Sequence, residues 1–380
     1  MLQRLLGRAG RLAVLGACTA AAALVAATAA GAATSVNVAC SDSAGLIAAV
    51  NAANAGGGGT INLAAGCTYA LTAMDNHDFG PTGLPVVVSA ITINGKGATI
   101  AGNNTNFRII AIDGSSGGAL TLNGVTITGG HIVGPGPAGA GGGILNLSGT
   151  LNTNNAVVTR NFASSAGGGI ANGIGATATL VKSTVSMNMV PDTGMGGGGG
   201  GILSIASTIT LNQSVVDHNT GPGGGGIASG NGNGGGPGSM ITLNSSVISN
   251  NTATSPFGGG GGIANGGTLQ ANNSQITGNT ADDSIGGGLF NHSAAQLNNT
   301  VVSGNSVPGG VGGGIANVTF DPSVPATLLM NNGAVTGNSA DFGAGGILNV
   351  GTSATLHNVG MSSNTPDNCE PPGSVSGCTG

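Results

Sequence analysis

Few carboxylates of this sequence are close together along the chain, although paired carboxylates are what many hydrolytic reactions need. Asp282 and Asp283 are the only adjacent acidic pair among twelve acids. Glycoside hydrolases use two carboxyl groups about 5–9.5 Å apart, so this pair is a candidate catalytic element. The pair follows Asn279 in a segment of turn-forming residues, and a solvated turn is the alternative interpretation.

Asp217, His218 and Arg160 form a second set of candidates. An imidazole beside a carboxylate can move a proton, and a guanidinium can hold an anionic group. The repeat described below places Arg160 and His218 two coils apart, roughly 10 Å, which is near enough to share a ligand but too far for direct contact. Exposed surface side chains without a role in chemistry are the alternative for all three.

Asp75 and Asp78 are candidate ligands of a cation, because carboxylate oxygens suit hard metal ions. They stand alone in a loop that runs to Pro85, so the metal-binding hypothesis rests on one short acidic cluster. The glycine runs lack the Lys-Ser/Thr of a phosphate loop and the Asp of the calcium-binding nonapeptide. No nucleophile elbow is recognisable. The sequence predicts no cofactor.

The composition is unusual and excludes several classes of protein. The chain has 380 residues, of which 78 are glycine, 5% are charged and 2% are aromatic. Seven Lys and Arg residues cannot build a surface that follows phosphates, which argues against nucleic-acid binding. Disorder needs low hydrophobicity and high net charge, whereas 39% of this chain is hydrophobic and its net charge is −5. These numbers leave a β protein rich in tight turns or a flexible glycine polymer.

The first 33 residues are predicted to be a secretory signal peptide. Arg4, Arg8 and Arg11 precede an apolar stretch, and Ala30-Gly31-Ala32 resembles a cleavage site. Removal of this segment leaves four basic and twelve acidic residues, a net charge of 4 − 12 = −8. We therefore expect a mature protein that is secreted or loosely bound to the cell surface, without insertion into the membrane.

Four cysteines remain after this segment, one close pair near each end of the chain. Three pairings are possible, and the local ones, Cys40–Cys67 and Cys369–Cys378, are favoured. Zinc binding fits poorly, because neither a CxxC motif nor a histidine cluster accompanies the cysteines. Each disulfide would restrain a chain end, where unfolding begins.

Internal repetition is the strongest signal in the sequence. The motif Gly-Gly-(Ile/Leu) recurs eight times at spacings of 25 to 36 residues, most often 26. Its apolar residue is Ile144, Ile170, Ile202, Ile227, Ile263, Leu289, Ile315 or Ile347. Each copy is followed by an apolar residue three positions before an asparagine, as in Val302 and Asn305. A period of this length predicts a solenoid of stacked coils.

Each repeat contains short runs of alternating apolar and polar residues, which predict strands. Glycine and asparagine suit the corners between them, because both tolerate positive φ. Asparagines at equivalent positions would stack into amide ladders. One such column is Asn212, Asn244, Asn272, Asn298 and Asn331. A structural role in these ladders is the favoured interpretation of the asparagines.

The repeat resembles that of a known architecture, the right-handed parallel β-helix of the pectin-lyase-like type. It is similar to the repeats of the polymorphic outer-membrane proteins, which carry GGA-(I/L/V) and FxxN motifs. The matching residues here include Gly168-Gly169-Ile170, Gly313-Gly314-Ile315 and Val302-Ser-Gly-Asn305. The motif alanine is usually glycine in this chain, and the phenylalanine is Val, Ile or Met. The resemblance implies a fold and says little about function.

We therefore predict an all-β, right-handed parallel β-helix of about ten coils with disulfide-closed ends. Residues 34–59 would form an N-terminal cap with a short amphipathic helix, and 60–140 the irregular early coils. Residues 141–364 would form the regular repeats, and 365–380 the C-terminal cap. The ends need covering because an open solenoid exposes its core.

The function that the sequence favours is a non-enzymatic extracellular scaffold or adhesion module that contacts a glycan or a cell-surface component. The alternative is a polysaccharide lyase or glycoside hydrolase that uses Asp217, Asp282 or Asp283. The Asp282-Asp283 pair resembles an element of the polygalacturonase-like enzymes, but the other elements of that family are missing. A remote alternative is ice binding by the Ser/Thr column that contains Asp217. Insertions at 190–196, 229–240 and 318–326, with Phe257, Phe320 or Phe342, are candidate partner contacts.

Overall fold

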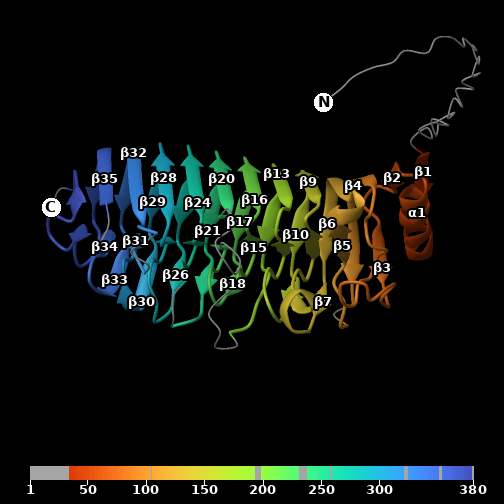
Figure 1. Ribbon diagram of the computed structural model, residues 1–380, viewed down its shortest axis with the longest axis horizontal. Coiled ribbons are helices and arrows are strands. Elements are labelled where there is room, and N and C mark those ends of the chain that lie inside the picture. The colour runs from red at the N-terminus through yellow and green to blue at the C-terminus, as the bar shows by residue number, and fades with distance from the viewer. Residues whose placement is uncertain are drawn as a thin grey trace, which may run out of the picture. The chain divides into compact units, whose positions relative to one another are not determined.

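The computed structural model describes residues 34–103, 105–192, 198–230, 238–256, 259–320, 324–350 and 353–378. The predicted signal peptide lies outside these residues, as do Phe257 and parts of the three predicted insertions. The described chain is a right-handed parallel β-helix of about eleven turns, which confirms the fold predicted from the repeat. Its strands stack along the long axis in Figure 1, with helix α1 (Ser43–Ala55) at the N-terminal end.

The strands form one large sheet, two smaller stacked sheets and one short pair, all built from equivalent segments of successive coils. The twenty-stranded sheet contains β1 Thr34–Val38, β2 Gly58–Leu63, β3 Thr68–Leu71, β4 Ala90–Gly102, β6 Ala119–Thr128, β9 Thr150–Asn154, β10 Val157–Thr159, β13 Thr177–Val181, β14 Thr184–Ser186, β16 Thr208–Asn212, β17 Val215–Asp217, β20 Met240–Asn244, β21 Val247–Ser249, β24 Thr268–Asn272, β25 Gln275–Thr277, β28 Ala294–Asn298, β29 Val301–Ser303, β32 Thr327–Thr336, β35 Ser353–Ser362 and β37 Val375–Ser376. The ten-stranded sheet contains β5 Ile110–Asp113, β8 Ile144–Leu147, β12 Ile170–Asn172, β15 Ile202–Ile205, β19 Ile227–Gly230, β23 Ile263–Asn265, β27 Leu289–Asn291, β31 Ile315–Val318, β34 Ile347–Val350 and β36 Cys369–Glu370. The five-stranded sheet contains β18 Thr220–Gly221, β22 Thr252–Ala253, β26 Thr280–Ala281, β30 Ser306–Val311 and β33 Ser339–Phe342. The short pair is β7 His131–Ile132 with β11 Phe162–Ala163, and two 3₁₀ turns, η1 Gly114–Ser116 and η2 Gly136–Gly139, complete the elements.

The register of the strands aligns the repeat markers. In the ten-stranded sheet, Ile144 pairs with Ile170 and Ile170 with Ile202, all in parallel strands. These isoleucines are fully buried and belong to one continuous core that runs the length of the stack. Each coil thus buries its apolar face against its neighbours, which a single coil could not do.

An inner asparagine ladder runs beside this core. It consists of Asn161, Asn188, Asn219, Asn251, Asn279, Asn305, Asn338 and Asn364. Each amide nitrogen donates to the amide oxygen of the next asparagine at 2.9–3.0 Å. All eight side chains are buried, so the ladder satisfies polar groups that would otherwise be costly to enclose.

Two more ladders accompany the inner one. The column predicted from Asn212 to Asn331 forms an outer, half-buried ladder with nitrogen–oxygen distances of 2.9–3.1 Å. A further buried ladder joins Asn265, Asn291, Asn317 and Asn349 and was not predicted from the sequence. Its signal was present, since each of these residues stands two positions after the repeat isoleucine or leucine.

The N-terminal cap is close to the prediction. Asp42 caps α1 by accepting a hydrogen bond from the amide of Gly45 at 2.8 Å, and Leu46 and Val50 are buried against the core. Strand β4 begins at Ala90. In the segment before β4, the side-chain amide of Asn54 in α1 bonds to the backbone of Val86 and Val88, and Val87 pairs with Ile112 of β5.

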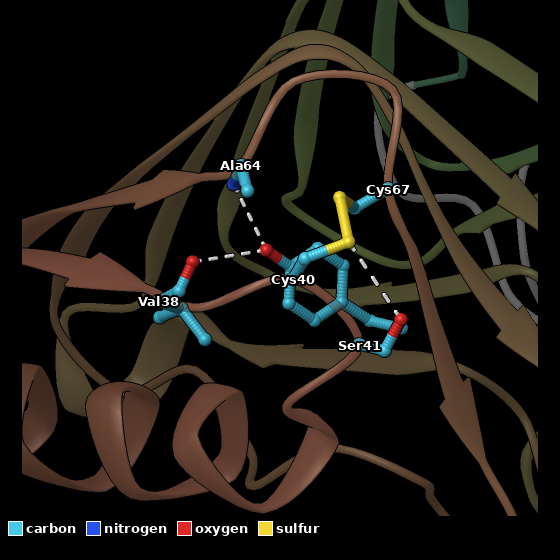
Figure 2. Close-up of a disulfide and its surroundings, with 6 residues drawn as sticks. Val38, Cys40, Ser41, Ala64 and Cys67 are labelled. Carbon is cyan, nitrogen blue, oxygen red and sulfur yellow. Dashed lines mark hydrogen bonds between the residues drawn. A yellow bond between two sulfur atoms is a disulfide. The ribbon is translucent and has the colours of Figure 1, made fainter.

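The two predicted disulfides are both present. Cys40 is bonded to Cys67 beside the first coil (Figure 2). The hydroxyl of Tyr69 accepts from the amide of Ala64 at 2.9 Å and donates to the carbonyl of Val38 at 3.0 Å.

Cys369 is bonded to Cys378 beside the last coil. Two disulfides are typical of a protein that folds in an oxidising compartment. No helix of the described residues has both the length and the apolar character that crossing a membrane requires.

Candidate functional site

Asp217 stands where the neighbouring coils carry a hydroxyl. It ends β17, and its register partners are Ser186 and Ser249. One carboxylate oxygen accepts from the hydroxyl of Ser249 at 2.7 Å and from the side-chain amide of Asn250 at 3.0 Å. The other lies 2.5 Å from Nδ1 of His218. Asp217 and His218, which are adjacent in sequence, thus form a side-chain hydrogen bond.

The hydrogen bonds around Asp217 decide its charge. Partial burial by itself would raise the pKa of this carboxyl group, but the bonds from His218, Asn250 and Ser249 outweigh it and the pKa lies below its usual value. Asp217 is therefore ionised at neutral pH. In a catalytic triad the histidine stands between the serine and the acid. Here the acid stands between Ser249 and His218, so this geometry does not activate the serine as a nucleophile.

Arg160 and His218 lie in one column, two coils apart, with Met187 between them. This agrees with the spacing expected from the repeat. All three residues have positive φ, between 53° and 55°. Arg160 is exposed and, within the described residues, has no carboxylate within ion-pair distance. Arg160 and His218 therefore share a corner of the solenoid, with one coil between them.

Asp282 and Asp283 are placed elsewhere. Both residues are exposed and directly follow β26 of the five-stranded sheet. Their coil also contains β25, which is separated from β17, the strand of Asp217, by the single strand β21. The backbone amide of Asp283 donates to the carbonyl of Pro308 at 2.8 Å, which joins this segment to the next coil. Among the described contacts, none links this pair to Asp217, so the structure gives no support to a joint catalytic role.

Asp75 and Asp78 lie in an exposed early loop. The carboxylate of Asp75 accepts from the side-chain amide of Asn76 at 3.2 Å, and its backbone amide donates to the carbonyl of Thr82. Over the described parts of the chain, no group of three or more His, Cys, Asp or Glu residues is arranged to hold a metal ion. The loop geometry accounts for these two acids without a ligand.

Arg108 is a buried residue whose importance was not predicted. Its guanidinium is fully enclosed and donates to the carbonyls of Ala140, Phe79, Pro137 and Ala138 at 2.7–3.2 Å. Burial lowers the pKa of Arg108 to about 10, so the group remains charged at neutral pH. It fastens the loop between β3 and β4, which contains Phe79, to the loop around η2 and is thus a structural residue.

The outward side chains that follow the repeat isoleucines and leucine in the ten-stranded sheet are apolar, and most of them are buried, with only Leu203 and Leu348 partly exposed. The residue after each repeat isoleucine or leucine points away from the core, because side chains alternate along a strand. All eight of these residues are apolar: Leu145, Ala171, Leu203, Ala228, Ala264, Phe290, Ala316 and Leu348. By contrast, the outward residues of β16 are Thr208, Thr210 and Asn212.

Two adjoining hollows of about 410 and 440 Å³ lie on this apolar face. They share Ser165, Ala166, Leu203 and Ile205 as lining residues, so together they form one depression, here called the outer groove. The outer groove extends from β8 to β27 along the stack. These strands are five coil spacings of about 4.8 Å apart, so the groove is roughly 24 Å long.

An aromatic cluster closes one end of the outer groove. The ring of Phe290 lies 5.3 Å from that of His292 and 5.7 Å from that of Phe320. His292 lines the groove, and its burial lowers its pKa below the usual value, so it is neutral at pH 7. Phe320 is 66% exposed. Aromatic residues are rare in this chain, and their gathering here distinguishes this end of the groove.

Comparison with known proteins gives distant likenesses only. No protein-family model and no curated protein matches the chain. Among solved structures, pectate lyase Pel9A is similar at 16% identity and a TM-score of 0.40, covering 84% of this chain and 74% of that one. The A-module of the Azotobacter vinelandii mannuronan C-5 epimerase AlgE6 is similar at 14% identity and a TM-score of 0.38, covering 89% of this chain and 96% of the module. At these values neither likeness decides what this chain does.

Proposed function

We propose that this protein is a non-enzymatic extracellular scaffold that binds an elongated ligand in the outer groove. The observation that carries the proposal is the pair of adjoining hollows, lined mainly by apolar side chains, that form the outer groove. A concave apolar hollow with a few polar groups is the usual form of a ligand-binding site. The ladders that hold the strands in register make the groove a preformed surface, which lowers the entropic cost of binding.

The groove favours a neutral glycan at a cell or matrix surface as the ligand. Its length of roughly 24 Å suits a chain molecule that lies along the stack. Its floor is aliphatic, and Phe320, which packs against the buried Phe290 and the half-buried His292, offers an exposed ring against which the apolar side of a sugar can pack. No Lys, Arg, Asp or Glu lines the described part of the groove, so recognition of a charged polymer is not favoured.

A glycan array probed with residues 34–380 tests this proposal. We expect binding to neutral glycans that Leu203→Asp weakens at least tenfold, because a carboxylate on the groove floor would be desolvated by the ligand. Thr210→Asp is the matched control, since it places the same charge on the outer face of the twenty-stranded sheet. Phe320→Ala should weaken binding severalfold.

Three results would overturn the groove as the binding site. Binding that survives Leu203→Asp would place the ligand elsewhere. Loss of binding in Thr210→Asp as well would show a general effect of charge. Absence of binding to any glycan would remove the proposed ligand class.

An enzymatic function is the alternative, and the ionised Asp217 beside His218 is the observation that favours it. If the chain is a polysaccharide lyase or hydrolase, incubation with pectin, alginate or neutral polysaccharides should release unsaturated or reducing sugars. Asp217→Asn should then abolish this release, whereas Asp282→Asn should not, because the two acids lie on different sheets. No release from any of these polymers would favour the scaffold.

A further inference from the structure

Three neighbouring coils differ from the later ones at one corner of the solenoid. The position before each inner-ladder asparagine is Arg160, Met187, His218, Asn250, Gly278, Gly304, Gly337 or Ser363, and all eight have positive φ. Glycine adopts this conformation without strain, whereas other residues lose about 1–2 kcal/mol. Met187 and His218 therefore carry their side chains at a cost that Gly278, Gly304 and Gly337 avoid in three of the later coils.

Two methionines flank one rung of the inner ladder. Asn188 points into the core and is buried, while Met187 and Met189 on either side of it are 48% and 46% exposed. The equivalent position to Met189 in the following coils is Thr220 or Thr252. Neither methionine belongs to the hydrophobic clusters of the described chain, so packing of the core does not explain them.

His218 lies beside this methionine pair. The amide of Met187 donates to the carbonyl of Asp217 at 3.1 Å, which places Met187 and His218 in adjacent coils, about 4.8 Å apart along the stack. His218 is exposed, and its hydrogen bond to Asp217 engages Nδ1. That bond orients the ring and leaves Nε2 as the nitrogen that faces away from the carboxylate.

We propose that Met187, Met189 and His218 form a binding site for the soft monovalent ion Cu⁺, with two thioether sulfurs and Nε2 as ligands. Thioethers select Cu⁺, whereas zinc takes thiolate, imidazole and carboxylate ligands. The long unbranched methionine side chains can converge on one ion above the corner. Asp217 acts as a positioning residue, because a carboxylate bonded to the second ring nitrogen fixes a metal-binding histidine.

Silver ion is the probe for this site, because Ag⁺ shares the soft ligand preference of Cu⁺ and does not change oxidation state. Protein labelled with ¹³C at the methionine methyl groups would be titrated with Ag⁺ and followed by NMR. We expect the signals of Met187 and Met189 to shift together with one-to-one stoichiometry. Met240, which is 44% exposed on β20, is the internal control and should not shift at that ratio.

Variants separate a metal site from incidental methionine binding. The double variant Met187→Leu/Met189→Leu keeps the apolar volume and should lower Ag⁺ affinity at least tenfold in calorimetry, whereas Met240→Leu should not change it. His218→Gln should lower affinity similarly. Asp217→Asn should weaken binding 10- to 100-fold without a comparable change in thermal stability, and Asp217→Glu should restore part of it.

Several outcomes would overturn the site. Equal affinity of the double leucine variant and the unchanged protein would exclude the two thioethers. A simultaneous shift of Met240 with Met187 would show that Ag⁺ binds any exposed methionine. Tighter binding of Zn²⁺ than of Cu⁺ supplied anaerobically would exclude a soft-metal site. The outer groove is on another sheet, so these results do not depend on the proposed function.

Discussion

Arg108 illustrates how one buried residue can determine the geometry of an irregular region. A fully enclosed guanidinium without a carboxylate partner is costly unless its donors are satisfied. Here the backbone carbonyls of two loops satisfy them, among them those of Phe79 and Ala138. The planar fork of arginine reaches both loops at once, which the single ammonium of lysine cannot do. The early coils, which have the least regular sequence, are thus held by one side chain.

Arg108→Lys should therefore destabilise the protein although it keeps the charge. We expect a loss of about 2–4 kcal/mol, because several carbonyls are left unsatisfied in a buried site. Thermal unfolding followed by circular dichroism measures the effect. Arg160→Lys is the matched control and should change stability by less than about 0.5 kcal/mol, since Arg160 is exposed. Equal effects of the two variants would contradict the role assigned to Arg108.

The asparagine ladders show how elements of this fold are held in register. A parallel strand can slip along its neighbour, but a slip by one residue would separate every rung of a ladder and turn the core residues outward. The inner ladder is enclosed, whereas the outer ladder is half exposed. The two ladders have similar bond lengths, so their contributions to stability should differ through burial.

Asn251→Ala should cost more than Asn244→Ala. The amide of Asn251 donates to Val216 and Asn279 and accepts from Asn219, all in a site without access to water. We expect about 2–4 kcal/mol for its removal, and less than about 1 kcal/mol for Asn244, whose partners can turn to solvent. Chemical denaturation of the two variants compares them directly. A larger loss in Asn244→Ala would show that burial does not govern these ladders.

At the scale of the whole molecule, the stack is a one-dimensional array whose weakest points are its ends. Each coil contacts its neighbours, so the terminal coils lack one neighbour and open first. Helix α1 covers the core at the N-terminal end, and a disulfide lies beside the first and the last coil. The caps therefore protect the groove and the corner site by preventing opening that starts at the ends.

Removal of the disulfides should loosen the ends and leave the middle of the stack unchanged. Cys40→Ser/Cys67→Ser should be more destabilising than Cys369→Ser/Cys378→Ser by about 1 kcal/mol, because the first bridge spans 27 residues and the second 9. Hydrogen exchange should accelerate in α1 and β1 in the first variant, but not in β16 or β20. Uniform acceleration along the chain would show that the molecule unfolds as one unit.

Much of this architecture could be predicted because the sequence repeats itself. The Gly-Gly-(Ile/Leu) motif predicts that Ile170 stacks on Ile202, and these two residues are register partners in the structure. The positions of the cysteines favoured two local disulfides, and both are present. The role of Arg108 could not be predicted, because it depends on loops that are distant in sequence and outside the repeat. The exposed Met189 beside the Asp217 column was likewise overlooked, although its position after Asn188 marks an outward residue.

The sequence by itself determined which residues stack, since a periodic pattern leaves one register in which every apolar side chain is buried. It also determined that few ionisable groups are available for chemistry. Only the tertiary structure decided which outward side chains share a surface. The apolar residues that line the outer groove, and the methionines and His218, become neighbours only when coils separated by 25 or more residues lie about 4.8 Å apart. That proximity arises from the ladders and the shared core, not from any local preference of the chain.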